Sequence, residues 1–439
     1  MKLLLKNGRL IDPISGRDER TNMLIIDGII EKIGSHVSGI TAADEINLQG
    51  KIIAPGFVDM HVHAREPGFE HKENLETVIA AAVAGGFTAI CCMPNTEPPI
   101  DSASVVEFIR KRSRDVLGGV VDVYPIAAVT KGREGVQLAP MAELANAGAV
   151  GFSDDGSPVE SAEIMRRAFE YSEMYGKPII QHAEERSMAH GGVMNEGVVA
   201  TSLGLPPIPP LAEELMIERD ISILRYLINE KIGSANNQPN ALRYHVAHIS
   251  TAGSVEIIRR AKMQGLPVTC EVTPHHFSLT EEAVRFFDTN TKMNPPLRTL
   301  QDIEAIKEGL RDGTIDVIAT DHAPHSFDEK QVEFVNAPFG VVGLETALGL
   351  AIRELVAKNV LSLAQIIEKM STNPRRIVHL PQLVIAPGER ANFTILDPEV
   401  EWVVNTSAFK SRSKNSPFHG WKLKGKPFAI VNNGSYLLS

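Results

Sequence analysis

The sequence predicts an α/β fold, namely a (β/α)8 barrel of the TIM type beside a small β-sandwich formed by the two chain ends. Three observations lead to this prediction. From Pro55 onward, short apolar segments alternate with amphipathic helical segments, as in parallel sheets built from βαβ units. Before and after this region, short apolar segments are separated by turn dipeptides. Polar residues that suit a metal ion follow several of the predicted barrel strands.

The two chain ends are predicted to form one β module. In residues 1–54, Asn7-Gly8 and Asp27-Gly28 each separate apolar segments, and such dipeptides favour two-residue hairpin turns. Residues 385–439 show the same turn-rich β pattern. This division leaves residues 55–384 for the barrel.

Eight strand candidates lie within the predicted barrel. In chain order they read FVDMHVH, FTAICCMPN, DVYPIAAVT, AVGFSDD, PIIQHAE, RYHVAHIS, PVTCEVTPHH and DVIATDHAPH. The segments between them place apolar residues at i, i+3 and i+4, which predicts helices. We favour a closed barrel over an open doubly wound sheet, because the open sheet normally carries a glycine-rich phosphate loop after its first strand and HVHAREPG is not one. The polar residues from Glu230 to Asn240 are expected to form a surface insertion.

Composition argues against several classes of function. The chain of 439 residues has a formal net charge of −10, which disfavours nucleic acid as the main partner. It has no apolar run long enough to cross a membrane and no signal-peptide pattern at Met1, so we expect a cytoplasmic protein without membrane contact. Its three cysteines show no CxxC spacing, which disfavours a thiolate metal site.

Histidines and aspartates follow the predicted strands at the end where barrel enzymes carry their functional groups. His61 and His63 end the first strand, and residues two apart on a strand point to the same side. The fourth, fifth, sixth and eighth strands end in Asp154-Asp155, His182, His248 and Asp321. Imidazoles and carboxylates at one rim suit zinc or a similar ion.

Each of these residues also has an ordinary structural interpretation. His182 or His248 alone could be a hydrogen-bonded core histidine, and Asp154-Asp155 alone could form a turn or cap a helix. Their joint placement at one rim favours a metal site. Arg65 follows His63 by two residues, and a guanidinium beside a dication indicates a substrate that carries both a carbonyl and an anion.

Taken together, the motifs resemble the amidohydrolase superfamily and, within it, the bacterial dihydroorotase family. The matching segments are PGFVDMHVHAREPG, GGFTAICCMPNTEPP, GFSDDG, IIQHAEE, YHVAHIST, EVTPHH, KMNPPLR, IDVIATDHAPH, PFGVVGLETALG and KNSPFHG. They extend from Lys51 to Gly420. Related binuclear hydrolases often bridge their ions with a carboxylated lysine on the fourth strand, whereas this chain has an aspartate there.

The resemblance implies one or two Zn²⁺ ions per chain. His61 and His63 would bind one ion, Asp155 would be a shared ligand, and His182 and His248 would hold a second ion where one is present. Asp321, also counted among the metal ligands, would be the catalytic general acid and base. The residues implied to contact the substrate are His63, Arg65, Asn95, Asn294, His325, Phe339 and Gly340.

The implied reaction is the reversible cyclisation of N-carbamoyl-L-aspartate to L-dihydroorotate and water, a step of pyrimidine biosynthesis. Arg65, Asn95 and His325 would bind the substrate carboxylate, while Asn294 and the backbone at Phe339-Gly340 would hold the ring. The implied partners are further copies of the chain and aspartate transcarbamoylase. Residues 325–338 are polar and long enough to form a lid over a ligand.

Two other functions compete with this interpretation. A hydantoinase or allantoinase would carry a lysine on the fourth strand and would give Arg65 and Asn95 no acidic substituent to bind. A catalytically silent relative that serves as a structural subunit for aspartate transcarbamoylase would have lost ligand histidines, and this chain keeps them.

Overall fold

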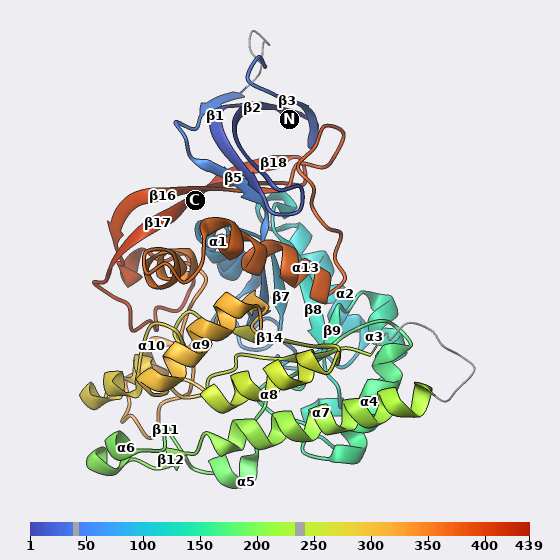
Figure 1. Ribbon diagram of the computed structural model, residues 1–439, viewed down its shortest axis with the longest axis vertical. Helices are drawn as coiled ribbons and strands as arrows, with labels where there is room; N and C mark the ends of the chain where they lie inside the picture. Colours follow the sequence, from blue (N-terminus) through green and yellow to red (C-terminus); the bar gives the residue numbers. More distant parts are fainter. Residues whose placement is uncertain (38–43, 233–241) are drawn as a thin grey trace.

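The computed structural model describes residues 1–37, 44–232 and 242–439. Figure 1 shows a barrel surrounded by helices and, at one end of the molecule, a sheet built from both chain ends. The N- and C-termini both lie at the end that carries this sheet (Figure 1).

Eight parallel strands form the barrel, in the spatial order of the chain. They are β6 (Phe57–Val62), β7 (Phe87–Cys92), β8 (Asp122–Ala127), β9 (Gly151–Phe152), β10 (Ile179–Gln181), β13 (Tyr244–Val246), β14 (Val268–Val272) and β15 (Val317–Ile318). The segment after β15 returns to β6, where the amide of His63 donates to the carbonyl oxygen of His322 (2.9 Å) and the amide of His322 to that of His61 (3.3 Å). The predicted barrel is confirmed.

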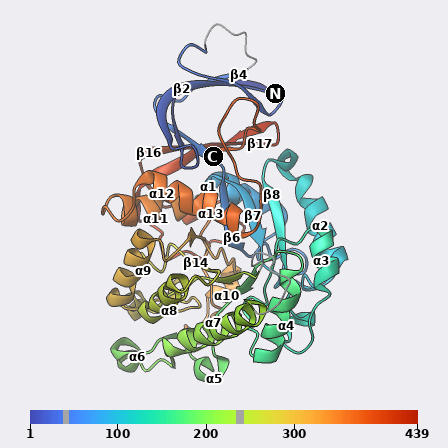
Figure 2. The ribbon, with the colours of Figure 1, turned by 45° about the vertical axis from the view of Figure 1, so that its right-hand side comes forward.

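Helices cover the outside of the barrel, as Figure 2 shows from a second direction. The longer ones are α1 (Leu75–Gly85), α2 (Ala103–Arg114), α3 (Met141–Ala147), α4 (Ala162–Glu173), α7 (Leu211–Ile232), α8 (Ala252–Met263) and α9 (Leu300–Asp312). Helix α1 begins with a reciprocal capping box between Asn74 and Thr77 and ends at Gly86, whose φ of 80° is the left-handed conformation that glycine tolerates. Of the predicted insertion, Glu230 to Ile232 form the end of α7, and residues 233–240 lie outside the described residues.

Shorter elements complete the barrel region. Those near the mouth are α5 (Arg186–Ala189), β11 (Met194–Asn195), α6 (Val198–Leu203), β12 (Pro207–Ile208) and α10 (Phe327–Lys330). Those after the last barrel strand are α11 (Ala347–Ala351), α12 (Leu363–Ile367) and α13 (Asn373–Ile377). The predicted lid segment, residues 325–338, therefore contains a turn of helix, α10, which begins with a capping box between Ser326 and Glu329.

The strands of both chain ends are hydrogen-bonded into one sheet, in the order β18-β17-β16-β5-β1-β2-β3, with β4 also paired to β1. They are β1 (Lys2–Asp12), β2 (Arg17–Ile26), β3 (Ile29–Ile33), β4 (Asp44–Asn47), β5 (Ile52–Pro55), β16 (Phe393–Val403), β17 (Lys422–Asn432) and β18 (Ser435–Leu438). Because β5 pairs with β16, the predicted joint module of the two chain ends is confirmed (Figure 1). Its bounds at residues 54 and 385 remain a prediction.

The terminal sheet packs against the amino ends of the barrel strands. Asn432 of β17 donates to the carbonyl oxygen of Val120 (3.1 Å) and to a carboxylate oxygen of Asp122 (3.0 Å), where β8 begins. The carboxyl ends of the strands, where a site is predicted, therefore face away from this sheet.

One of the two predicted hairpins is confirmed and the other is wrong. Asp27-Gly28 connects β2 to β3, as predicted. Asn7-Gly8 instead lies inside β1, where the register against β2 shifts between Leu5 and Gly8. Asn7 has a φ of 55°, so the residue adopts the left-handed backbone that the dipeptide predicts, but a β-bulge uses it in place of a turn.

No helix of the described residues is long and apolar enough to span a lipid bilayer.

Candidate active site

A cavity of about 370 Å³ opens at the carboxyl ends of the barrel strands. Its lining comprises His63, Arg65, Asn95, Asp155, Gly156, His182, His248, Asn294, Asp321, Ala323, His325, Pro338, Phe339 and Gly340. All the predicted site residues except His61 line it, and His61 is fully buried beside His63. The structure thus brings the predicted residues together, while their roles remain predictions.

Strand ends place the candidate ligands at this cavity. His61 lies within β6, His63 follows it directly, and Asp155, His182 and His248 follow β9, β10 and β13 within three residues.

Three of the predicted residues have a left-handed backbone, which residues other than glycine seldom adopt. The φ angles are 62° at Arg65, 31° at His248 and 48° at Asp321. Such conformations cost about 1–3 kcal/mol each and gather at functional sites, where the surrounding structure holds them in place. Other residues of the described chain share this conformation, but these three meet around one cavity.

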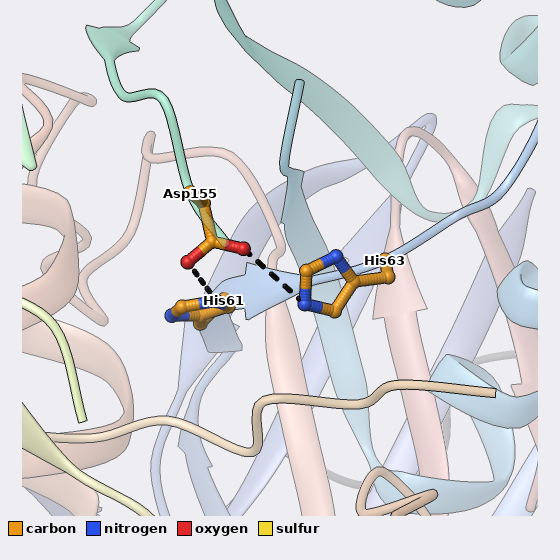
Figure 3. A group of neighbouring side chains, drawn as sticks. All are labelled: His61, His63 and Asp155. Carbon is orange, nitrogen blue, oxygen red and sulfur yellow. Dashed lines mark ion pairs between the residues drawn. The ribbon is translucent and has the colours of Figure 1, made fainter. Parts of the chain in front are cut away.

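Asp155 lies between two groups of histidines. His61 Nε2 is 3.4 Å from Oδ1 of Asp155, and His63 Nε2 is 3.6 Å from Oδ2 (Figure 3). On the other side, His182 Nδ1 and His248 Nε2 lie 3.7 and 3.8 Å from Oδ1. Asp155 thus forms a group of three with each pair of histidines. Within each group, the candidate ligand atoms all lie within 4.8 Å of one another.

The chemistry of these atoms fits metal ions. Among the described residues, His61 Nε2 and Asp155 Oδ1 are buried without a hydrogen bond although they lie 3.4 Å apart, and a metal ion would satisfy both atoms. His182 Nδ1 and His248 Nε2 are 2.9 Å apart, and they lie 3.7 and 3.8 Å from the same carboxylate oxygen of Asp155. Neutral imidazoles and a carboxylate that converge in this way are typical ligands of zinc and similar ions.

Glu271 in β14 sets the orientation of the His61 ring. Its carboxylate is fully buried and accepts a hydrogen bond from Nδ1 of His61 (2.7 Å), which leaves Nε2 free for a metal. The other oxygen of Glu271 contacts Nε2 of His245 (3.2 Å). No sequence motif assigned a role to Glu271, although an acidic residue inside the strand segment PVTCEVT was a signal of a buried, paired carboxylate.

Asp154 and Asp155 face in different directions, which the sequence alone does not reveal. Asp154 accepts hydrogen bonds from the amides of Val129 (2.8 Å) and Thr130 (3.1 Å), so it anchors the end of the neighbouring strand. Asp155 alone of the pair faces the histidines. Arg133 donates to the carbonyl oxygen of Asp155 (2.6 Å) and supports it from behind.

Burial and opposite charges act against each other in this cluster. Burial favours the neutral form of His61, but the surrounding carboxylates, Asp155 first among them, outweigh it and hold the pKa of the ring well above its usual value. Burial also disfavours the charged form of Asp155, and His61 and the other imidazoles hold its pKa well below the usual range. The carboxylates stay ionised at neutral pH and attract cations to the site.

The predicted substrate contacts line the same cavity. Arg65 donates from Nε to the carbonyl oxygen of Pro324 (3.2 Å), and its Nη2 lies 3.5 Å from Nε2 of His325. His325 in turn donates from Nε2 to the carbonyl oxygen of Phe339 (2.8 Å). Burial first, and then the charge of Arg65, lower the pKa of His325 to about 2, so this ring is neutral.

Two asparagines that line the cavity contact the candidate metal-binding histidines. Asn95 Oδ1 accepts a hydrogen bond from Nδ1 of His63 (2.7 Å). Asn294 Nδ2 donates to Glu184 (2.6 Å) and lies 3.4 Å from Nε2 of His182. Glu184, which the sequence analysis did not single out, faces the adjoining hollow that Asn294 and Phe339 also line.

Comparison with known proteins decides the family. Residues 50–254 match a family model described as Dihydro-orotase-like. A protein named Dihydroorotase from Pelotomaculum thermopropionicum is 49% identical over 438 residues, covering 100% of this chain and 99% of that protein. The chain belongs to the dihydroorotase family. A second member, from Acetivibrio thermocellus, is 47% identical over 436 residues, or 99% of each chain.

Solved structures agree with the barrel of this dihydroorotase-family chain. The L-hydantoinase (dihydropyrimidinase) of Arthrobacter aurescens superimposes with a TM-score of 0.86 at 25% identity, covering 100% of this chain and 96% of that one. Dihydropyrimidinase from Brevibacillus agri gives a TM-score of 0.80 at 21% identity, which shows the shared fold. As a member of the dihydroorotase family, the chain is a cyclic amide hydrolase with a metal cofactor, and its His/Asp groups could hold the metal.

Proposed function

We propose that this chain interconverts N-carbamoyl-L-aspartate and L-dihydroorotate, with zinc held by His61, His63, His182, His248 and the shared ligand Asp155. One observation carries the proposal. A single cavity is lined both by metal-ligand residues and by Arg65. A cyclic amide that bears a carboxylate matches both kinds of residue.

Asp321 is the proposed general acid and base. Its Oδ1 lies 3.0 Å from Nε2 of His63 and 3.5 Å from Nε2 of His61. Burial opposes its charged form, but the imidazoles, His61 foremost, hold the pKa of Asp321 well below its usual value, so it is ionised at neutral pH. When bound, zinc acts as a Lewis acid that activates water and polarises a carbonyl. In hydrolysis Asp321 takes the proton of the water and delivers it to the leaving amide nitrogen, and in ring closure it moves the proton back.

Arg65, Asn95 and His325 are proposed to bind the carboxylate of the substrate. A planar guanidinium can donate two parallel hydrogen bonds to a carboxylate, which a lysine cannot do. The neutral ring of His325 has a single N–H, which Nε2 donates to the Phe339 carbonyl oxygen, so this N–H would turn to the carboxylate when substrate binds. Asn294, Phe339 and Gly340, which line the same cavity, are proposed to hold the ring.

The assembly and location expected from the sequence remain proposals. They comprise a homo-oligomer, a complex with aspartate transcarbamoylase and a place in the cytoplasm. Hydantoin or allantoin hydrolysis is less well supported, because neither substrate carries a carboxylate for Arg65. A catalytically silent subunit is also less well supported, because every proposed ligand is present and buried.

Side-by-side assays test the proposed function. The purified chain is analysed for bound metal, loaded with zinc and assayed with L-dihydroorotate, hydantoin and allantoin. We expect turnover of L-dihydroorotate to exceed that of the two uncharged rings by orders of magnitude. Comparable or faster hydrolysis of hydantoin or allantoin would reject the proposed substrate, and no turnover of any of them by metal-loaded protein would favour the silent subunit.

A further inference from the structure

The connection between β16 and β17, residues 404–421, leaves the terminal sheet and reaches the rim of the barrel. It contains the segment KNSPFHG, to which the proposed function assigns no role. We name residues 410–415 of this connection the rim strap. The strap is tied down by Glu73, which is fully buried and accepts hydrogen bonds from the hydroxyl of Ser411 and the amide of Arg412 (3.1 Å).

Asn415, at the end of the rim strap, bonds to two loops at once. Its Oδ1 accepts a hydrogen bond from the amide of His325 (3.1 Å). Its Nδ2 donates to the carbonyl oxygens of Ala323 (3.0 Å) and Gly340 (3.1 Å). Its own carbonyl oxygen accepts from the amide of Val342 (2.9 Å). Asn415 is 5% exposed, so both ends of its amide are satisfied by protein.

The two loops that Asn415 joins form one wall of the cavity. His322 forms a parallel β-bridge with Val62 of β6 on one side and with Val341 on the other. The hydrogen bond from the amide of Val342 to the carbonyl oxygen of Asn415 adds the rim strap beside them. Gly340 packs so closely against Ala323 that a Cβ at position 340 would lie only 2.8 Å from the Cβ of Ala323. The distance between the loops is therefore set by backbone contacts and by the Asn415 side chain.

We propose that Asn415 is a positioning residue for the substrate carboxylate. It fixes the backbone of His325 relative to Gly340 and thereby the position of the His325 ring, whose Nε2 bonds to the Phe339 carbonyl and lies 3.5 Å from Arg65. Asn415 touches none of the proposed metal ligands in the hydrogen bonds of the described residues. It should therefore affect substrate binding and leave metal binding and the chemical step unchanged. This inference rests on the proposed function.

Two variants test the proposal against a matched control. Asn415→Ala removes all the side-chain bonds, while Asn415→Asp keeps the acceptor for His325 but places a carboxylate oxygen against the carbonyls of Ala323 and Gly340. The control is Asn432→Ala, which removes another buried asparagine that joins the C-terminal segment to the barrel, but at the amino ends of the strands. All proteins are zinc-loaded, and metal content, thermal unfolding, kcat and KM for L-dihydroorotate are measured.

We expect both Asn415 variants to raise KM about tenfold while kcat stays within about threefold and metal content is unchanged. Asn432→Ala should lower the unfolding temperature and leave KM unchanged. An unchanged KM in the Asn415 variants, a fall in kcat alone, or an equal rise of KM in Asn432→Ala would overturn the proposal. If neither Asn415 variant folds while Asn432→Ala does, Asn415 serves stability and the proposal is wrong. A wild-type chain inactive towards dihydroorotate would instead refute the proposed function.

Discussion

At the scale of single residues, the site depends on which ring nitrogen of each histidine is hydrogen-bonded to another side chain and which one remains for a metal ion. Nδ1 of His61 donates to Glu271 and Nδ1 of His63 donates to Asn95, so both rings present Nε2 to Asp155. These outer contacts orient both rings before any ion binds.

The first prediction concerns Asp321. Asp321→Asn removes the proposed proton acceptor but keeps the size of the side chain, and four histidines with Asp155 remain to hold metal. We expect kcat to fall about 10²- to 10⁴-fold with nearly unchanged metal content. Initial rates with L-dihydroorotate and metal analysis of the same samples measure both quantities. Substantial activity in the variant would remove Asp321 from its proposed role.

The second prediction concerns Glu271. Glu271→Gln replaces the carboxylate that accepts from His61 Nδ1 with an amide that can also turn its donor towards the ring. We expect the affinity for zinc to fall about 10- to 100-fold, as for other partners of metal-binding histidines. Competition with a coloured zinc chelator measures this without an activity assay. Asp220→Asn, a buried carboxylate outside the candidate metal groups, is the control, and equal affinities in the two variants would contradict the prediction.

At the scale of elements, strand ends could be predicted because they need only local patterns. Apolar segments followed by His or Asp identified β6, β9, β10, β13 and β15 and the residues that follow them. Glu271 and Asn415 could not be assigned in this way, because their partners His61 and His325 lie 210 and 90 positions away. The left-handed backbone of Asn7 is compatible with a turn and with a β-bulge. The pairing of β1 with β2 makes it a bulge, and the local sequence does not contain that information.

The third prediction concerns Asp220, where α7 packs on β13. Its carboxylate accepts from the hydroxyl of Tyr244 (2.9 Å), and burial outweighs this bond and the nearby Arg219, raising its pKa to about 6. Between about pH 4 and 6 the folded chain then binds more protons than the unfolded chain, so stability falls as pH rises. The free energy of unfolding, relative to Asp220→Asn, should drop by about 3 kcal/mol over this range and stay level above it.

Urea unfolding of both proteins at a series of pH values measures this difference. A difference that is independent of pH, or one that grows as pH rises, would show that folding does not raise the pKa of Asp220.

At the scale of the whole molecule, the two ends of the barrel have separate tasks. The terminal sheet closes the amino ends of the strands, with Asn432 bonded at the start of β8. The carboxyl ends carry the cavity, and the connection that contains the rim strap links the two ends, because it leaves β16 and reaches the mouth. The family and the barrel are established by close relatives, whereas the metal and substrate roles of single residues depend on the geometry of this cavity.

The central claim is that the histidines and Asp155 hold the metal on which turnover depends. Its most direct test is a titration of metal-free protein with zinc, in which bound zinc and L-dihydroorotate hydrolysis are followed together. We predict no activity at the start and a rise in proportion to bound zinc that levels off at one or two ions per chain. Full activity of the metal-free protein, or zinc bound to those ratios without any turnover, would contradict the account.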